Sequence, residues 1–207
     1  MPVALDVRVV ELLCSRLCHD LVSPVGAINN GVELIEEMGE SMAEEAMQLI
    51  AHSAEQASKR LRVFRLAYGA AGSQGDLSAS DARAVLEGWF RGGRVRLDWR
   101  ADGLSDPPRG LLKCLLNLVL LAEESVGAGG DIRVERAGEG LRVTALGRGA
   151  ALKPEARLAL DGTTAPADLD PRTVQAYVTG RFAAHFDLAV TVETAPDTVA
   201  FGLSAVG

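Results

Sequence analysis

Apolar residues recur at steps of three and four along two stretches near the start of the chain. The first stripe, within residues 6–38, consists of Val10, Leu13, Cys14, Leu17, Leu21, Pro24, Val25, Ile28, Val32 and Ile35. The second, within residues 42–68, consists of Met42, Ala46, Leu49, Ile50, Ser53, Ala57, Leu61, Phe64 and Tyr68. Such spacing predicts amphipathic α-helices. Gly39 is a stop signal, and Ser41 followed by Glu44 predicts an N-cap for the second helix. Residues 1–70 therefore predict a helical hairpin.

The pattern changes after residues 69–75, whose Gly, Ala and Ser content predicts a flexible linker. Helical spacing returns in residues 81–90, 111–125 and 171–186. Alternation predicts strands at residues 94–100, 131–136, 141–146, 189–193 and 198–204. Residues 147–170 predict a loop with at most a short helical turn. Residues 76–207 thus predict an α/β sandwich with helices on one face of a mostly antiparallel sheet, and the whole chain is expected to be α+β.

One apolar stripe per helix is difficult to bury within a single hairpin. Two hairpins from two chains can place four stripes around one core, so we expect a homodimer through residues 6–68, built as a four-helix bundle. The alternative is that the hairpin packs on its own C-terminal domain.

Composition narrows the class of partner. The 207 residues carry a net charge of −7, with a pI near 5.0, which disfavours general binding to nucleic acids and to anionic membranes. We find no signal-peptide pattern and no apolar run long enough to span a bilayer. Three cysteines are a sparse set, typical of reduced thiols, and we expect a cytoplasmic protein without a metal site.

Candidate chemistry lies in the segment RLCHDLVSPV, residues 16–25. His19 lies off the apolar stripe, and histidine is a nucleophile that is largely unprotonated at neutral pH. Asp20 could hold one ring nitrogen as N–H, and Arg16 could hold phosphoryl oxygens. The neighbouring face contains Ser15, Ser23 and Gly26, whose small side chains would let a partner surface approach. Pro24 removes a helical hydrogen bond and is expected to bend the helix, which would turn the histidine face outward. The alternative is an ordinary surface histidine on a kinked helix.

The run His19-Asp20-Leu21-x-x-Pro24 resembles the phosphoacceptor box of sensor histidine kinases. The longer run from Leu17 to Ile28, with Asn30-Gly31-Val32-Glu33-Leu34 beyond it, is similar to the ChpT-type histidine phosphotransferases of alphaproteobacterial phosphorelays. The resemblance implies a dimeric hairpin followed by a degenerate domain that is similar to the ATPase domain of histidine kinases. It also implies a catalytic His19 supported by Asp20 and Arg16, and a receiver-docking face at Ser15, Ser23, Pro24 and Gly26.

The same resemblance indicates where a nucleotide site would lie. Asn117 resembles the first asparagine of the kinase N-box, but Leu121 stands where the second, a magnesium ligand, would be. Leucine offers no oxygen to a hard cation. The run after residues 141–146 has no acid at the place of the adenine-binding aspartate. We therefore expect no ATP binding and no cofactor, with magnesium held only by partner receivers.

Without ATP, the phosphoryl group would come from an aspartyl phosphate on another protein. The resemblance implies a donor receiver domain of a hybrid histidine kinase (CckA-like) and acceptor response regulators (CtrA-like and CpdR-like), including a regulator of the cell cycle. The expected activity is protein histidine phosphotransfer through His19. Two alternatives remain open: a non-catalytic dimeric adaptor that docks or inhibits receivers or kinases, and an active ATP-using kinase.

Overall fold

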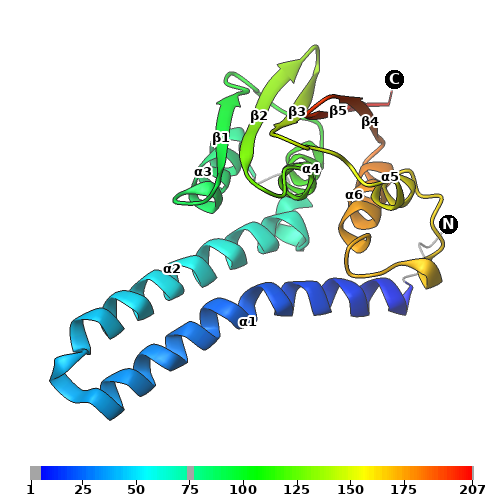
Figure 1. Ribbon diagram of the computed structural model, residues 1–207. Coiled ribbons are helices and arrows are strands. Elements are labelled where there is room, and N and C mark those ends of the chain that lie inside the picture. The colour runs from blue at the N-terminus through cyan, green and yellow to red at the C-terminus, as the bar shows by residue number, and fades with distance from the viewer. Residues whose placement is uncertain (1–5, 74–76, 207) are drawn as a thin grey trace.

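The computed structural model describes residues 6–73 and 77–206, and two long antiparallel helices form its N-terminal part (Figure 1). Helix α1 spans Val7–Met38 and α2 spans Ala43–Ala67, with a 3₁₀ turn, η1, at Gly39–Ser41 between them. The predicted hairpin is thus confirmed. The predicted cap at Ser41 is wrong, because its hydroxyl donates back to the Met38 carbonyl, 2.8 Å away, and α2 begins after Met42.

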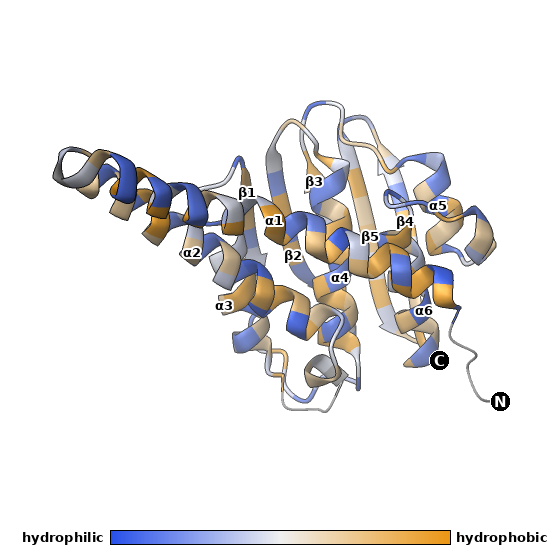
Figure 2. Cartoon of the chain, turned by 90° about the horizontal axis from the view of Figure 1, so that it is seen from below, coloured by the Kyte–Doolittle hydropathy of each residue, from blue (hydrophilic) through white to orange (hydrophobic). Residues whose placement is uncertain are grey.

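The two helices approach each other closely at Gly31. This residue is buried, and a Cβ atom there would lie 2.6 Å from Cγ1 of Ile50 and 3.2 Å from the Ala46 carbonyl oxygen. Closer to the chain start, Pro24 interrupts the hydrogen-bond ladder of α1, and Figure 1 shows α1 bending along its length. Seen from below in Figure 2, the far end of the hairpin projects beyond the rest of the molecule.

The remaining elements form an α/β unit with a five-stranded sheet in the order β1-β2-β3-β5-β4. Strands β1 and β2 pair in parallel and the other neighbours are antiparallel. The elements are α3 (Ala79–Phe90), β1 (Val95–Arg100), α4 (Leu111–Ser125), β2 (Gly130–Ala137), β3 (Gly140–Leu146), α5 (Pro154–Leu160), η3 (Pro166–Asp168), α6 (Val174–His185), β4 (Leu188–Ala195) and β5 (Thr198–Ala205). The helices lie on one face of the sheet, as predicted (Figure 1). Residues 147–170 are more ordered than expected, since they contain α5 and η3.

Helix α4 is the centre of the molecule. All of its residues are buried except Glu123 and Glu124. This burial agrees with its sequence, because a helix that is apolar on nearly all faces belongs in a core. It packs against the sheet, α6 and the C-terminal end of α2. The hairpin therefore packs in part on its own α/β unit, as one alternative anticipated, and Leu12 of α1 joins the same core.

A buried polar cluster fixes the end of α2 to α4. The Asn117 amide donates to the Ala67 carbonyl at 2.7 Å, and the Lys113 ammonium donates to the Gly69 carbonyl at 2.6 Å. Both carbonyls belong to the last turn of α2 and its exit, where helical partners are missing. Gln175 of α6 completes the cluster by donating to Oδ1 of Asn117 at 3.3 Å.

The first residues of the flexible linker predicted at 69–75 are ordered rather than flexible. Gly69 is held by Lys113, and Ala70–Ser73 form a short 3₁₀ turn, η2. Residues 74–76 of the expected linker lie outside the described residues. In the described ranges, no helix is long and apolar enough to cross a membrane.

Lys113 makes a pH-dependent contribution to stability. Burial lowers the pKa of its ammonium from an ordinary 10.5 to about 8. Between these values the unfolded chain binds more protons than the folded one, so stability should rise with pH, by about 1–2 kcal/mol between about pH 7.5 and pH 9.5. Urea unfolding followed by circular dichroism should show the stability of the native protein rising by this amount relative to that of Lys113→Met, since the opposing effect of the Cys114 thiol, whose pKa burial raises to about 12, is present in both proteins. An equal pH dependence in both proteins would contradict the assignment.

Candidate functional site

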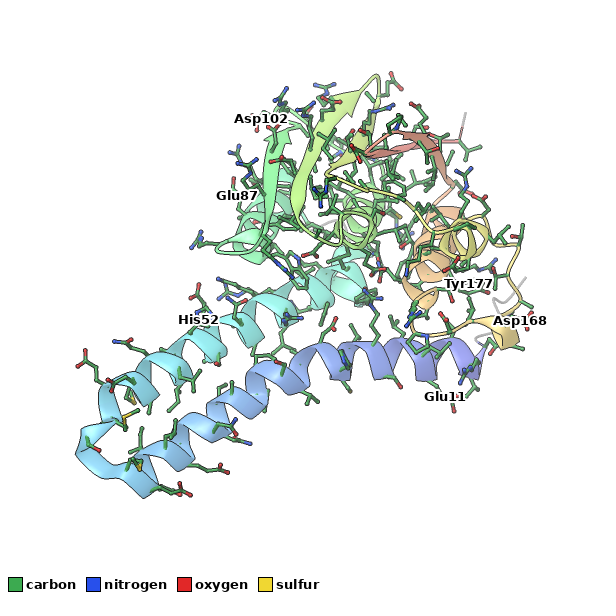
Figure 3. All side chains as sticks on the ribbon, in the orientation of Figure 1. Glu11, His52, Glu87, Asp102, Asp168 and Tyr177 are labelled. Carbon is green, nitrogen blue, oxygen red and sulfur yellow. The ribbon has the colours of Figure 1, made fainter. Side chains whose placement is uncertain are left out.

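His19 is a highly exposed side chain in the first half of α1. Its side chain is 88% exposed, and Nδ1 lies 3.4 Å from Oδ1 of Asp20, whose side chain is 26% exposed. A carboxylate beside Nδ1 favours the neutral tautomer that carries its proton there, in which Nε2 has the free lone pair. The two other histidines of the chain are elsewhere: His52 is exposed on α2 (Figure 3), and His185 ends α6.

A groove of about 610 Å³ lies beside His19, between α1 and the α/β unit. Its walls come from α1, the C-terminal end of α4, the segment that enters α5, and the segment that enters α6. The residues lining it are Ser15, Arg16, His19, Asp20, Leu121, Glu124, Ser125, Ala151, Leu152, Lys153, Ala156, Pro171 and Arg172. The His19 imidazole on the hairpin thus borders a groove whose lining comes largely from the α/β unit.

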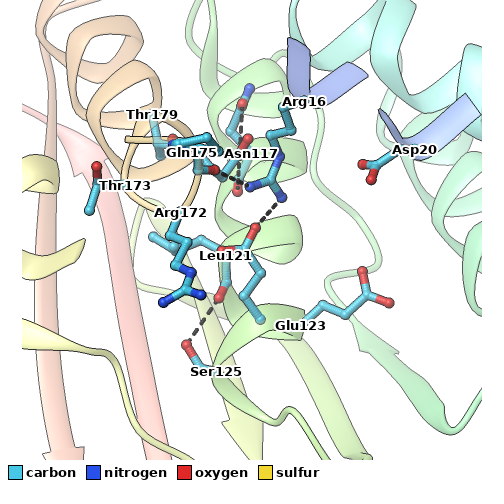
Figure 4. A network of polar contacts seen from close by, with 12 residues as sticks. Arg16, Asp20, Asn117, Leu121, Glu123, Ser125, Arg172, Thr173, Gln175 and Thr179 are labelled. Atoms are coloured by element: carbon cyan, nitrogen blue, oxygen red, sulfur yellow. Dashed lines mark hydrogen bonds and ion pairs between the residues drawn. The ribbon is translucent and has the colours of Figure 1, made fainter. Parts of the chain in front are cut away.

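The Arg16 guanidinium spans this boundary. It forms an ion pair with Glu124 of α4, and its Nη1 donates to the Pro171 carbonyl at 3.5 Å. Figure 4 shows Arg16 reaching toward the C-terminal end of α4. Burial is the largest influence on the pKa of Arg16 and lowers it, but the charges of Glu124, Tyr68 and Asp20 and the hydrogen bond to Glu124 together outweigh burial, so the pKa is raised.

Three carboxylates gather near this ion pair. Burial is the largest cause that raises the pKa of Glu124, and Arg16 opposes it. Burial likewise raises the pKa of Glu123, which accepts a hydrogen bond from Nε1 of Trp89 at 2.8 Å. The charge of Asp20 raises the pKa of both glutamates further. Arg16 opposes the rise in the pKa of Glu124 most strongly, with Lys153 behind it, while Arg60 opposes the rise at Glu123.

The α/β unit contributes cations from its own side of the groove. Lys153 immediately precedes α5, and Arg172 lies in the turn before α6. That turn is fixed by Asp170, whose carboxylate accepts hydrogen bonds from the backbone N–H groups of Arg172 and Thr173 at 2.9 and 2.8 Å. An aspartate that bonds the backbone two and three residues ahead is a common way to open a helix.

The places where the resemblance put nucleotide chemistry are occupied by other contacts. The Asn117 side chain is buried and fully hydrogen-bonded within the cluster that holds α2. Leu121 lines the groove. In the loop after β3, the Gly149 N–H donates to the Asp197 carboxylate of the β4–β5 turn at 2.6 Å. The likeness of this unit to a kinase ATPase domain stays a prediction.

The predicted site residues divide into two groups. Ser15, Arg16, His19 and Asp20 border one groove. Ser23 is exposed, Gly26 is half-buried and Pro24 is buried on α1, so Pro24 offers little surface of its own, and the receiver-docking role of these residues stays a prediction. The buried face of Pro24 belongs to the core stripe, and its effect is on the path of α1.

Sequence reasoning missed Glu124, Lys153 and Arg172. Glu124 gave one signal, since it ends a long apolar helix with a charge, but its partner is 108 residues away in sequence. Within residues 6–73 and 77–206, no group of three or more His, Cys, Asp or Glu residues could hold a metal ion.

Comparisons with known proteins agree on one family. Residues 79–198 match the model of the histidine phosphotransferase C-terminal domain. Over 195 residues, 92% of each chain, the sequence is 35% identical to protein phosphotransferase ChpT of Brucella abortus (strain 2308). A solved bacterial phosphotransferase is similar with a TM-score of 0.78 and 33% identity, over 99% of this chain and 100% of that one.

Proposed function

The chain belongs to the histidine phosphotransferase family, and on that basis we propose that it carries a phosphoryl group on His19 between receiver domains of a phosphorelay. The observation that supports this most directly is an imidazole that is 88% exposed, held through Nδ1 by Asp20, at the edge of a groove between the hairpin and the α/β unit. An exposed nucleophile with an oriented ring is what a protein-to-protein transfer requires.

The transfer is a displacement at phosphorus. Nε2 of His19 attacks the phosphoryl group of an aspartyl phosphate, a P–N bond forms, and the P–O bond to the receiver breaks to release its carboxylate. The Nδ1 proton stays on the ring, and Asp20 stabilises the resulting cationic phosphoimidazole. The reverse sequence delivers the phosphoryl group to a second receiver. Positioning and charge stabilisation supply most of the catalysis in such reactions.

The source of the phosphoryl group is another protein rather than ATP in this proposal. Support comes from Asn117, whose side chain is used in the cluster that holds α2, and from Leu121, which offers no ligand to magnesium. Magnesium is supplied by the receivers. The donor is the receiver of a hybrid histidine kinase, and the acceptors are response regulators.

Docking uses both sides of the groove. Ser15 and Ser23 are exposed on α1, and Val22, one turn from His19, is 68% exposed and offers an apolar contact. On the other side, Lys153 and Arg172 carry charges opposite to those of an aspartyl phosphate and its acidic surroundings.

The hairpin is also proposed to form a homodimer. Of eleven large hydrophobic side chains exposed in the described residues, nine belong to α1 and α2, among them Val25, Val32 and Leu49. A concentration of exposed apolar surface on one part of a chain marks a protein contact. The projecting end of the hairpin in Figure 2 leaves room for a second copy, which would complete a four-helix bundle.

The test of transfer uses a matched pair of histidine variants. A response-regulator receiver from the same genome is charged with radiolabelled acetyl phosphate, freed of the small molecule, and mixed with this protein. Label should appear on the native protein and also on His52→Gln, because His52 lies away from the groove. It should fall to background on His19→Gln, which lacks the proposed nucleophile. Binding of the receiver without transfer of label would instead favour the adaptor. Label taken from ATP alone would favour a kinase.

Dimerisation is tested by measuring the molar mass of the protein in solution. Native protein at micromolar concentration should have twice the chain mass of 21.8 kDa by light scattering. Val25→Glu and Val32→Glu should shift it toward a single chain, because each places a charge in the apolar contact. Leu158→Glu, on the exposed surface of α5, serves as the control and should remain dimeric. A native protein that is monomeric at this concentration would rule the bundle out.

A further inference from the structure

The Arg16 side chain joins three elements of the fold. Its guanidinium pairs with Glu124 of α4 and donates from Nη1 to the Pro171 carbonyl at 3.5 Å, in the segment that enters α6. Both side chains are partly shielded, with 21% and 35% of their surface exposed. Arg16 lies three residues before His19 and four before Asp20, so the contact holds the helical turn that carries the imidazole.

We propose that Arg16 and Glu124 form a positioning pair, which sets the distance between the His19 turn of α1 and the α/β unit so that a docked receiver contacts both together. The inference rests on the proposed function and changes the role expected for Arg16. The guanidinium acts through the position of His19 and not by holding phosphoryl oxygens.

The contacts of Arg16 argue against a direct role. An arginine that holds a phosphoryl group normally presents two N–H groups in parallel to two oxygens. Here one terminal nitrogen is used by Glu124 and the other by the Pro171 carbonyl. These contacts use two of the five N–H groups of the guanidinium, and the Glu124 carboxylate offsets its charge, so the side chain is held at the boundary between α1 and α4 and its attraction for a phosphoryl group is reduced.

The surrounding charges explain why the pair is needed. Asp20 borders the same groove as Glu124 and raises the pKa of its carboxyl, while Glu123 lies in a separate pocket with Arg60 and Trp89. Without Arg16, Glu124 and Asp20 would repel each other across the boundary between α1 and α4, with only the weaker attraction of Lys153 to offset it. The boundary would then widen, and His19 would move away from Lys153 and Arg172.

The experiment exchanges the charges of Arg16 and Glu124 and measures the phosphorylation of each variant by two different phosphodonors. The variants are Arg16→Glu, Glu124→Arg, the double exchange, and Glu124→Gln, which keeps an oxygen acceptor. Each is phosphorylated in single-turnover reactions by the charged receiver, over a range of receiver concentrations, and separately by phosphoramidate, a small molecule that needs no docking. Far-ultraviolet circular dichroism and thermal unfolding confirm that each variant is folded.

A positioning pair predicts a specific pattern. Each single reversal should lower receiver-dependent transfer at saturation by about tenfold or more, and the double exchange should restore it to within about threefold of the native rate, since close charge pairs couple strongly. Glu124→Gln should have an intermediate rate. Phosphoramidate should label His19 at nearly the native rate in all four. As a matched control, Arg83→Glu breaks the pairs of Arg83 with Glu87 and Asp102, both labelled in Figure 3, and should leave both reactions unchanged.

Three results would overturn the inference. Normal receiver-dependent transfer in Glu124→Arg would show that the pair is not required. A folded double exchange that stays slow with both donors would show that Arg16 contacts the phosphoryl group itself. If native protein is labelled by phosphoramidate but never by receivers, the proposed function fails first, and the pair has no transfer to position.

Discussion

The arrangement of the molecule depends on how the last carbonyl groups of α2 are satisfied. A helix end leaves carbonyls without helical partners, and burying them unpaired is costly. The Asn117 amide and the Lys113 ammonium, both from the central helix α4, supply the missing donors to Ala67 and Gly69. Since α4 is buried between the sheet and the hairpin, these bonds fix the direction in which α2 leaves the α/β unit. Because α1 packs along α2, the direction of α2 also sets the position of α1.

The surroundings of His19 depend on this packing of the hairpin against α4. Helix α1 packs along α2, which the polar cluster holds, and the Arg16–Glu124 pair joins α1 to α4. The imidazole therefore lies at the edge of a groove whose other wall is α4 and the segments entering α5 and α6. Asn117, where the sequence resemblance to histidine kinases put a nucleotide site, donates hydrogen bonds within the polar cluster that holds α2. The α/β unit has become, in our account, a docking wall for a partner that brings its own phosphoryl group and metal ion.

Much of the fold could be predicted because its signals are local. The apolar helix at 111–125 and the strands followed from periodicity alone, and the structure places them within one or two residues. His19 and Asp20 were found because the short run around them resembles the phosphoacceptor box of histidine kinases, a signal carried by neighbouring residues. Glu124 was not found, because its partnership with Arg16 spans 108 residues and only the fold brings them together. Ser41 failed as a cap for a related reason: its hydroxyl had a competing acceptor, the Met38 carbonyl, that a capping motif does not reveal.

The central claim is that a single nitrogen of this chain bears phosphorus received from another protein. Mass spectrometry of peptides from protein incubated with a phosphorylated receiver, without ATP and under alkaline conditions that preserve phosphoramidates, tests it most directly. The account predicts one added phosphoryl group per chain, on the peptide that contains His19. An unmodified His19 peptide, from a sample in which the receiver remained phosphorylated, would contradict it.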